Sequence, residues 1–252
     1  MISVVVLTKN EEKNIARCLN QLKWADEIIV VDDYSTDDTV RIAKSRGARV
    51  FRRKLDNNFA QQRNFALRKA KNKWVFFIDA DEIVSPTLAN EIVRRVKKDT
   101  CDGFYLFRRE IFGDKILHCI DKPIWDWTPG PIKLLRLAKR NKSKWVGKVH
   151  ERWLIAGKIG QLSHPLYHKS FSNLSDALKK INFYSSIRSQ ELSQKQTKVH
   201  WWQIVFYPLA KFLKNFFWHR GFFDGTRGLI FCLLMSLHSF LVRGKLWQLN
   251  QR

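Results

Sequence analysis

Residues 74–82 read Trp-Val-Phe-Phe-Ile-Asp-Ala-Asp-Glu, a bulky apolar run that gives way at once to acidic residues. Such a run predicts a β-strand that is buried on both of its faces. The acids then lie at the mouth of a buried strand, where carboxylates repel one another unless a cation or hydrogen-bond donors hold them. An Asp-x-Asp triplet such as Asp79 and Asp81 is expected about once by chance in this composition, so its position after the strand makes it informative.

The segments before this strand repeat its design. Residues 2–7, 27–31 and 48–52 are each typical of a β-strand, and helical patterns separate them. Strands that alternate with helices of this length predict an α/β fold with a mostly parallel sheet, flanked by helices and joined by right-handed crossovers. Ser85 and Pro86 supply a cap and a first-turn proline for the helix after the acids.

Polar residues mark the expected ends of the intervening helices. Asn10 is placed as the N-cap of the first helix, and Ser35 or Thr36 can cap the second. Gly47 can end the second helix in a left-handed conformation. A third helix is expected over residues 59–70, ahead of the acidic strand.

The polar strand ends indicate where a ligand would bind. Ligands of a parallel α/β sheet bind beyond the carboxyl ends of its strands. The sequence has no GxGxxG and no GxxxxGK[ST], so it lacks the phosphate loop of a Rossmann dehydrogenase or a P-loop NTPase. Acids at strand ends can instead hold a diphosphate through a divalent cation. The simpler alternative is an acidic turn that caps the helix at Pro86. Three clusters would meet at this edge: Thr8/Asn10/Glu11, Asp32/Asp33 and Asp79/Asp81.

The charge balance indicates an anionic partner. The 252 residues include 46 Lys and Arg and 23 Asp and Glu, a net charge of +23. Such an excess favours nucleic acid, an acidic membrane or phosphorylated small molecules. No RRM, KH, helix-turn-helix or zinc-finger pattern is present, so we expect no nucleic acid as a partner. The four cysteines lack the spacing of a zinc site or of a disulfide framework.

The last part of the chain is basic and aromatic. A helix is expected over residues 173–191, and residues 195–252 carry nine Lys and Arg against one acid, interleaved with Trp and Phe. This composition is typical of helices that lie in a membrane interface with the apolar face down and cations toward anionic headgroups. The apolar run 228–242 is too short for a bilayer span of about 20 residues. The alternatives are a helical cap on the sheet or a dimer interface, so an oligomer stays open.

Four motifs in order resemble family 2 glycosyltransferases of the GT-A fold. They are ISVVVLTKNEE from Ile2, IIVVDDYSTDDT from Ile28, Gln62-Arg63-Asn64 followed by Ala66, and WVFFIDADE from Trp74. Beyond them Gly147-Lys148-Val149-His150-Glu151, Tyr167-His168 and Gly221-Phe222-Phe223-Asp224-Gly225 resemble, more loosely, the subgroup that builds lipopolysaccharide core and is related to β-1,4-glucosyltransferases. The resemblance implies a GT-A catalytic domain over residues 1–170, a helical region over 171–252, and a UDP-sugar donor held with a divalent metal, Mg or Mn.

The resemblance also implies roles for single residues. The family carries an aromatic residue before Asn10, where this chain has Lys9. For Arg63 the alternative is a solvated helix face, and for Thr8 and Asn10 it is helix capping. The implied roles are the first nucleotide-binding loop for Thr8, Asn10 and Glu11, the base for Asp33, the diphosphate for Arg63, the ribose for Asp79, and the metal for Asp81.

An inverting transfer needs a general base for the attacking hydroxyl and an electrophile for the leaving diphosphate. Glu151 is the predicted base because it follows a short strand-like segment over residues 145–149, and Asp126 is the second candidate. His168 is predicted to complete the metal shell, with a structural role as the alternative. Trp125 and Trp127, in the loop 121–131, could stack on an acceptor sugar.

Together these observations predict an inverting glycosyltransferase that moves a hexose, glucose from UDP-glucose, onto a lipid-linked saccharide such as lipopolysaccharide inner core. We expect a peripheral protein on the cytoplasmic face of the inner membrane, since the N-terminus lacks the features of a signal peptide. Two alternatives stay open. One is transfer onto polyprenyl phosphate, and the other is a non-enzymatic basic protein that binds a membrane or nucleic acid and retains a nucleotide-binding fold.

Overall fold

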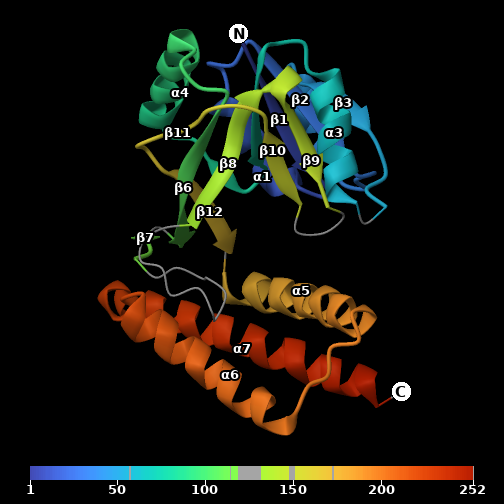
Figure 1. Ribbon diagram of the computed structural model, residues 1–252, viewed down its shortest axis with the longest axis vertical. Helices are drawn as coiled ribbons and strands as arrows, with labels where there is room; N and C mark the ends of the chain where they lie inside the picture. Colours follow the sequence, from blue (N-terminus) through green and yellow to red (C-terminus); the bar gives the residue numbers. More distant parts are fainter. Residues whose placement is uncertain (57, 114, 119–131, 148–150, 172, 252) are drawn as a thin grey trace. The chain divides into compact units, whose positions relative to one another are not determined.

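The computed structural model describes residues 1–56, 58–113, 115–118, 132–147, 151–171 and 173–251. The chain forms two compact units (Figure 1). The sheet unit comprises Met1–Arg108 and Lys133–His168, and the helical unit comprises Arg109–Ile132 and Lys169–Arg252. Each unit is described by itself.

Four parallel strands form one half of the sheet. They lie in the order β3-β2-β1-β4, and Thr8 is opposite Asp32 while Leu7 is opposite Asp79. Three strands therefore end side by side, which brings their polar residues to one edge. The strands are β1 (Ile2–Thr8), β2 (Glu27–Asp32), β3 (Arg49–Arg52) and β4 (Trp74–Asp79).

The sheet continues beyond β4 in a different sense. β8 (Ile132–Lys139) runs antiparallel to β4, and β6 (Gly103–Phe112), β12 (Leu166–Phe171) and β5 (Glu82–Ile83) follow it in that order. The short β7 (Lys115–Ile116) and β11 (Ile159–Gln161) pair with β6. A separate antiparallel pair is formed by β9 (Ser143–Val146) and β10 (Arg152–Ile155).

Helices cover both faces of the parallel strands, as their two-sided apolar runs predicted. One face packs against α1 (Glu12–Asn20), α2 (Thr39–Ser45) and α4 (Pro86–Lys98). The other packs against α3 (Phe59–Lys69) and the β9-β10 pair. On this second face the rings of Trp145 and Trp153 stack at 4.9 Å, and Phe77 meets both edge-on. The predicted α/β architecture is confirmed.

Two of the predicted helix signals are confirmed. Ser85 Oγ accepts the backbone N–H of Leu88 at 3.2 Å, with Pro86 in the first turn of α4. Gly47 has φ +78° and donates its N–H to the carbonyl of Lys44 at 3.0 Å, which ends α2. Glycine is favoured there because it adopts positive φ without steric cost.

Two other predicted caps are wrong. Asn10 does not cap α1, because it has φ +54° and its Oδ1 accepts the backbone N–H of Thr36 at 2.9 Å. Ser35 and Thr36 do not cap α2, which begins at Thr39. The hydroxyl of Ser35 donates instead to the buried carboxylate of Asp32. Both residues join the loops that follow β1 and β2, so contacts between loops override the local capping preference.

Three helices form most of the helical unit. α7 (Gly225–Asn250) packs against both α5 (Leu174–Gln194) and α6 (Trp201–Leu213). A π-helical turn (Lys214–Trp218) and a 3-10 turn (Gly221–Asp224) connect α6 to α7. Asn173 caps α5 by accepting the backbone N–H of Asp176 at 2.9 Å. The core of the unit includes Leu117, Ala177, Ile181, Phe231, Cys232, Leu234 and Met235.

The apolar run 228–242 lies inside a helix longer than the run itself. α7 has 26 residues, because it continues through Arg243 and Lys245 to Asn250. By length and composition the segment Gly221–Asn250 could cross a bilayer, although 33% of its most apolar window is buried within the protein. The expectation that this part of the chain is too short for a span does not hold for the helix as a whole.

Gly228 tests the close packing at the start of α7. A Cβ added there would lie 2.0 Å from the carbonyl oxygen of Gly221, a backbone atom that cannot easily move. We expect Gly228→Ala to lower the free energy of unfolding by about 2 kcal/mol. At Gly244, in the same helix, no described residue lies within 4 Å of such a Cβ. Gly244→Ala should therefore raise stability by about 0.5–1 kcal/mol. Urea unfolding checks both variants, and equal effects would contradict this packing.

Candidate active site

A buried arginine lies between two of the strand-end acids. Arg136, on β8, donates from Nη2 to Asp79 Oδ2 at 2.7 Å and to Glu82 Oε1 at 3.1 Å. Arg136 is 6% exposed and Glu82 is fully buried. Glu82 Oε2 also accepts the backbone N–H of Asp79 at 2.8 Å. The pairing of β8 with β4, in which Leu137 lies opposite Phe76, brings Arg136 to the end of β4.

The contacts of Arg136 separate the charge states of the two acids. Burial raises the pKa of Asp79, but attraction to Arg136 and Arg63 outweighs it and holds the pKa well below its usual range. Burial raises the pKa of Glu82 above its ordinary value, in spite of Arg136. Burial lowers the pKa of Arg136, but Asp79 and Glu82 outweigh it, so Arg136 stays charged. Asp79 is therefore a carboxylate at neutral pH, while burial shifts Glu82 toward its neutral form.

A second buried arginine approaches Asp79 from α3. Arg63 Nε donates to Glu151 Oε1 at 3.0 Å, and Nη2 lies 3.6 Å from Asp79 Oδ1. The guanidinium lies over the rings of Trp145 and Phe77, at 4.7 and 5.4 Å from their centroids. Its buried Nη1 has no hydrogen-bond partner among the described residues. An unsatisfied buried donor costs about 1–3 kcal/mol. A phosphate oxygen would satisfy it, which fits the role predicted for Arg63.

Asp81 and His168 are neighbours at the same strand end. β12 pairs with β5 so that His168 lies opposite Glu82, and His168 Nε2 is 3.3 Å from Asp81 Oδ2. Adjacent ligands of an octahedral Mg²⁺ are about 3 Å apart, so this pair fits two neighbouring positions. Within the described parts of the chain no group of three or more His, Cys, Asp or Glu side chains could hold a metal. A cation here would take its other ligands from substrate oxygens or water.

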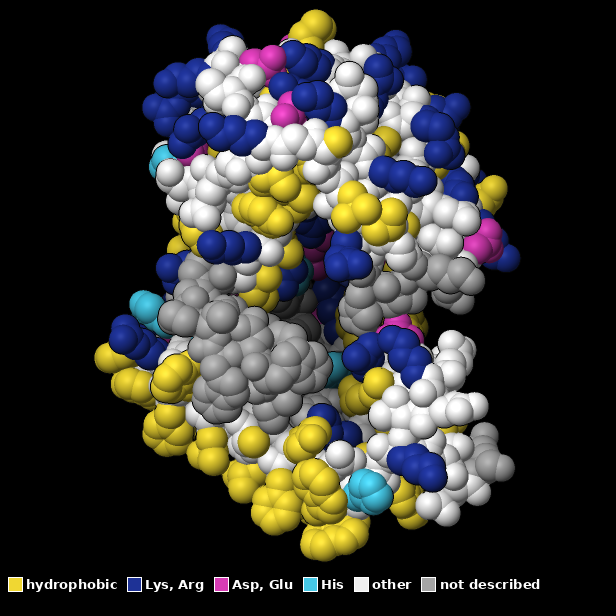
Figure 2. Space-filling model, in the orientation of Figure 1, with side chains coloured by type: hydrophobic (Ala, Val, Ile, Leu, Met, Phe, Trp, Pro, Cys, Tyr) yellow, Lys and Arg dark blue, Asp and Glu magenta, His cyan; other side chains and the backbone are white. Residues whose placement is uncertain are grey.

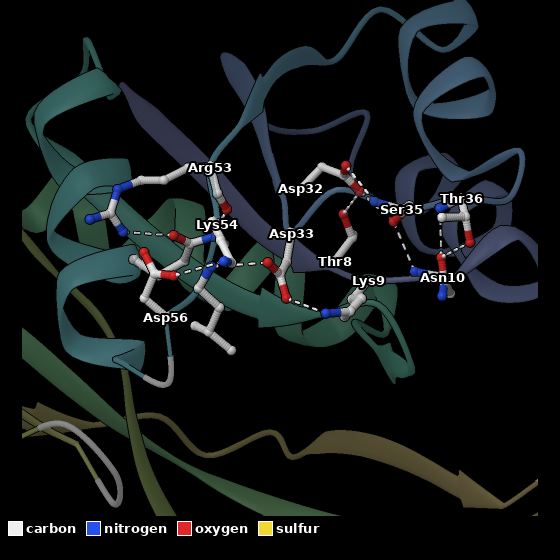
Figure 3. Close-up of polar contacts among 12 residues, drawn as sticks. Thr8, Lys9, Asn10, Asp32, Asp33, Ser35, Thr36, Arg53, Lys54 and Asp56 are labelled. Carbon is white, nitrogen blue, oxygen red and sulfur yellow. Dashed lines mark hydrogen bonds and ion pairs between the residues drawn. The ribbon is translucent and has the colours of Figure 1, made fainter.

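The predicted base-reading acid is already hydrogen-bonded (Figure 3). Asp33 Oδ2 accepts from Lys9 Nζ at 2.7 Å, and Oδ1 accepts the backbone N–H of Leu55 at 2.9 Å. The side chain of Asp33 is 12% exposed, whereas that of Lys9 is 62% exposed. An exposed cation thus lies where the resemblance implies an aromatic residue, and it pairs with Asp33 rather than forming a stacking surface.

The two remaining loop residues of this cluster serve the scaffold. Thr8 Oγ1 donates to the buried Asp32 at 3.3 Å, so Thr8 is not a helix cap. The backbone N–H of Asn10 donates to Ser35 Oγ at 2.8 Å, and its side chain accepts from Thr36 (Figure 3). The loops after β1 and β2 are therefore joined by several hydrogen bonds, which fixes the edge at which a nucleotide would bind.

The other predicted residues fall in different places. Glu11 donates its backbone N–H to Thr39 Oγ1 at 2.7 Å, and its carboxylate accepts from Asn14 at 2.8 Å. The side chain of Glu151 is 15% exposed and joins the acidic cluster through Arg63. Four residues lie outside the described part of the chain: Trp125, Asp126, Trp127 and His150.

Comparison with known proteins agrees with this geometry. A family model described as glycosyl transferase family 2 matches residues 3–143 of this chain. The chain belongs to glycosyltransferase family 2. An uncharacterized glycosyltransferase of Rickettsia typhi is similar to this family 2 enzyme, with 32% identity over 99% of this chain and 87% of the relative. The lipopolysaccharide core biosynthesis glycosyltransferase LpsC of Rhizobium meliloti is 26% identical over 98% of this chain and 92% of LpsC.

The fold is also similar to that of a solved structure. TarS 1–349 of S. aureus, in complex with UDP-GlcNAc, aligns with a TM-score of 0.51 and 16% identity over 95% of this chain and 89% of that chain. At this identity the likeness concerns the fold. The predicted GT-A-type fold is confirmed, and family membership indicates a glycosyltransferase that uses a nucleotide-sugar donor.

The roles of three residues of this family 2 glycosyltransferase were not predicted from the sequence: Glu82, Arg136 and Lys9. Glu82 follows Asp81 directly, and Arg136 is a cation within the otherwise apolar run Leu134-Leu135-Arg136-Leu137. An isolated arginine between buried strand residues indicates a buried acidic partner, so this signal could have been used. Lys9 was noted only as a departure from the family pattern, and its pairing with Asp33 needed the structure.

Arg136 should stabilise the protein far more than an exposed cation does. Arg136→Met leaves the buried Glu82 and the partly exposed Asp79 without this cation, so we expect the free energy of unfolding to fall by about 3 kcal/mol. Lys9→Met removes the exposed partner of Asp33 and should cost less than about 1 kcal/mol. Chemical denaturation of both variants measures the difference. Comparable losses would show that Arg136 does not hold the strand end.

Glu82 should make stability depend on pH in a defined direction. Its raised pKa means that the folded state favours the protonated carboxyl, so this stabilisation is complete below the ordinary pKa of about 4.3. It is lost as the pH rises through the higher pKa of the folded state. Glu82→Gln is neutral throughout, so its stability relative to wild type should increase from about pH 4 toward neutrality. Chemical denaturation across this range checks the sign, and a flat or falling difference would contradict it.

Proposed function

We propose that this glycosyltransferase transfers a hexose, glucose from UDP-glucose, with inversion onto a lipid-linked saccharide of the lipopolysaccharide core. The observation that carries the proposal is the grouping of Arg63, Asp79, Asp81 and His168 at the end of β4. It combines a pair that fits a divalent cation with a buried guanidinium whose Nη1 has no acceptor among the residues described. A nucleoside diphosphate supplies oxygens to both.

Asp81 and His168 would hold the divalent cation, Mg²⁺ or Mn²⁺. When bound, the cation neutralises charge that develops on the leaving diphosphate. Arg63 donates to the diphosphate from Nη1 while its Nε stays on Glu151. Asp79, kept ionised by Arg136 and Arg63, accepts from a ribose hydroxyl.

Recognition of the base is assigned to Asp33. Both of its oxygens already accept one hydrogen bond, from Lys9 and from the backbone of Leu55. A carboxylate oxygen can accept a second bond, so the imide N–H of uracil can be added without breaking either contact. Thr8, Asn10 and Glu11 support this edge by joining the loops on either side of it.

Glu151 is the proposed general base. Its ion pair with Arg63 holds one carboxylate oxygen, so the proton of the attacking hydroxyl would go to the second oxygen. Asp126 stays the second candidate. A general base acts on the acceptor hydroxyl, so replacing Glu151 should reduce kcat more than donor binding.

The acceptor is inferred from the likeness to LpsC and from charge. LpsC is named for lipopolysaccharide core biosynthesis. A net charge of +23 favours an acceptor that carries phosphate and carboxylate groups. We assign binding of the nucleotide-sugar donor to residues 1–170. Residues 171–252 are assigned the attachment of the protein to the cytoplasmic face of the inner membrane.

Calorimetry with UDP tests the metal-binding pair. Wild type should bind UDP more tightly when Mn²⁺ is present, and Asp81→Asn or His168→Asn should remove about 10–100-fold of that affinity while leaving metal-free binding unchanged. Asp33→Asn is the matched control, because it should weaken UDP binding with and without Mn²⁺. Wild-type affinity that does not respond to any divalent metal would overturn the proposed site. Product analysis with core saccharide and with polyprenyl phosphate then identifies the acceptor.

A further inference from the structure

The outer face of α6 and of the π-helical turn after it is apolar. Every exposed side chain of residues 201–218 is hydrophobic, with exposed fractions from 42% for Trp202 to 72% for Trp201. Apolar side chains gather over this part of the surface in Figure 2. We call the set the α6 face: Trp201, Trp202, Val205, Phe206, Leu209, Leu213, Phe217 and Trp218.

Three polar residues of the same segment lie on its inner side. Lys211 is 9% exposed, Lys214 is 2% exposed, and Asn215 is fully buried. The expectation that cations of this segment face lipid headgroups is therefore wrong for these two lysines. They follow Pro208 on the helix side that packs into the unit, where a water-soluble helix would place its apolar residues. The segment therefore buries these polar side chains beside Phe212 and Phe216, which pack against the core of the unit, and exposes apolar side chains on its other side.

The pattern at the ends of the α6 face matches a lipid bilayer. Trp201 and Trp202 lie at its start and Trp218 at its end, and tryptophan is enriched where a protein meets the membrane–water interface. Exposed cations flank it, with Lys195 and Lys198 before it and Arg220 after it. Lipid phosphates complement these cations, while the eight side chains of the α6 face offer a polar partner no hydrogen-bonding group other than the three indoles.

We propose that the α6 face inserts into the acyl-chain region of a phospholipid bilayer and attaches the protein by hydrophobic burial rather than by attraction to anionic lipid. The helix lies in the plane of the interface, with its flanking cations at the level of the phosphates. The inference rests on the proposed function only for the reason that the enzyme acts at a membrane. A water-soluble protein rarely exposes so much continuous apolar surface without a partner.

Sedimentation of the full-length protein with liposomes of phosphatidylcholine alone tests the proposal. Binding should persist in about 0.5 M NaCl, where surface attraction is screened within a few ångströms. Lipids brominated in the acyl chains should quench tryptophan fluorescence. The affinity of the double variant Phe206→Asp/Leu209→Asp for the liposomes should fall by at least about tenfold. Both residues are more than half exposed, so the fold should survive, and circular dichroism checks this.

A matched control uses exposed apolar residues on another helix. Leu178→Asp/Phe183→Asp, on α5, should leave liposome binding unchanged. Binding that requires anionic lipid and is lost in high salt would overturn the proposal. The proposal would also be overturned if the α6 face mediated a dimer. In that case Phe206→Asp/Leu209→Asp would dissociate the dimer, and wild type would not bind vesicles.

The two proposals can fail separately. Hydrolysis of UDP-glucose in solution should be the same in wild type and in Phe206→Asp/Leu209→Asp, because these residues belong to the helical unit. Wild type that binds phosphatidylcholine vesicles but neither binds UDP nor hydrolyses UDP-glucose would refute the proposed function and leave the membrane surface intact. The converse result would refute only the membrane surface.

Discussion

Arg136 lies between Asp79 and Glu82, and the edge of the sheet unit at which a nucleotide would bind depends on this contact. Acids at the end of a buried strand repel one another and lose the solvation of water. The guanidinium offsets both effects for Asp79, while Glu82 responds with a raised pKa. Once this end of β4 is fixed, Asp81 meets His168 through the β12-β5 pairing, and Arg63 reaches Asp79 from the other side.

The parallel half of the fold could be predicted because its signals are local. Apolar runs with polar ends fixed β1, β2 and β4, and Ser85 fixed the start of α4. The errors arose where distant segments compete with local preference. Asn10 is a good capping residue by type, yet Thr36 in another loop binds its side chain. Arg136 lies 57 positions from Asp79, and only the antiparallel register of β8 brings the two together.

Composition was least informative in the helical unit. It correctly indicated helices rich in lysine and aromatic residues, but a count of charges does not say which way each side chain faces. Lys211 and Lys214 were expected outside and are buried, while Phe206 and Leu209 are exposed. Helical spacing places Lys211 on the side of α6 away from Phe206 and Leu209, so this part of the pattern was present in the sequence. Which side of the helix faces the protein became clear only from the packing of α6 against α7.

The ion pair between Lys9 and Asp33 has a consequence for how the two ends of a donor would be recognised. The exposed Lys9 offsets part of the charge that Asp33 presents to an uncharged nucleobase. Selection there depends on the order of donors and acceptors along the base edge. The diphosphate end meets Arg63 and a cation, so it depends on Coulomb attraction. Raising the ionic strength would then lower the affinity for every nucleoside diphosphate by a similar factor. The selectivity among bases would stay almost unchanged.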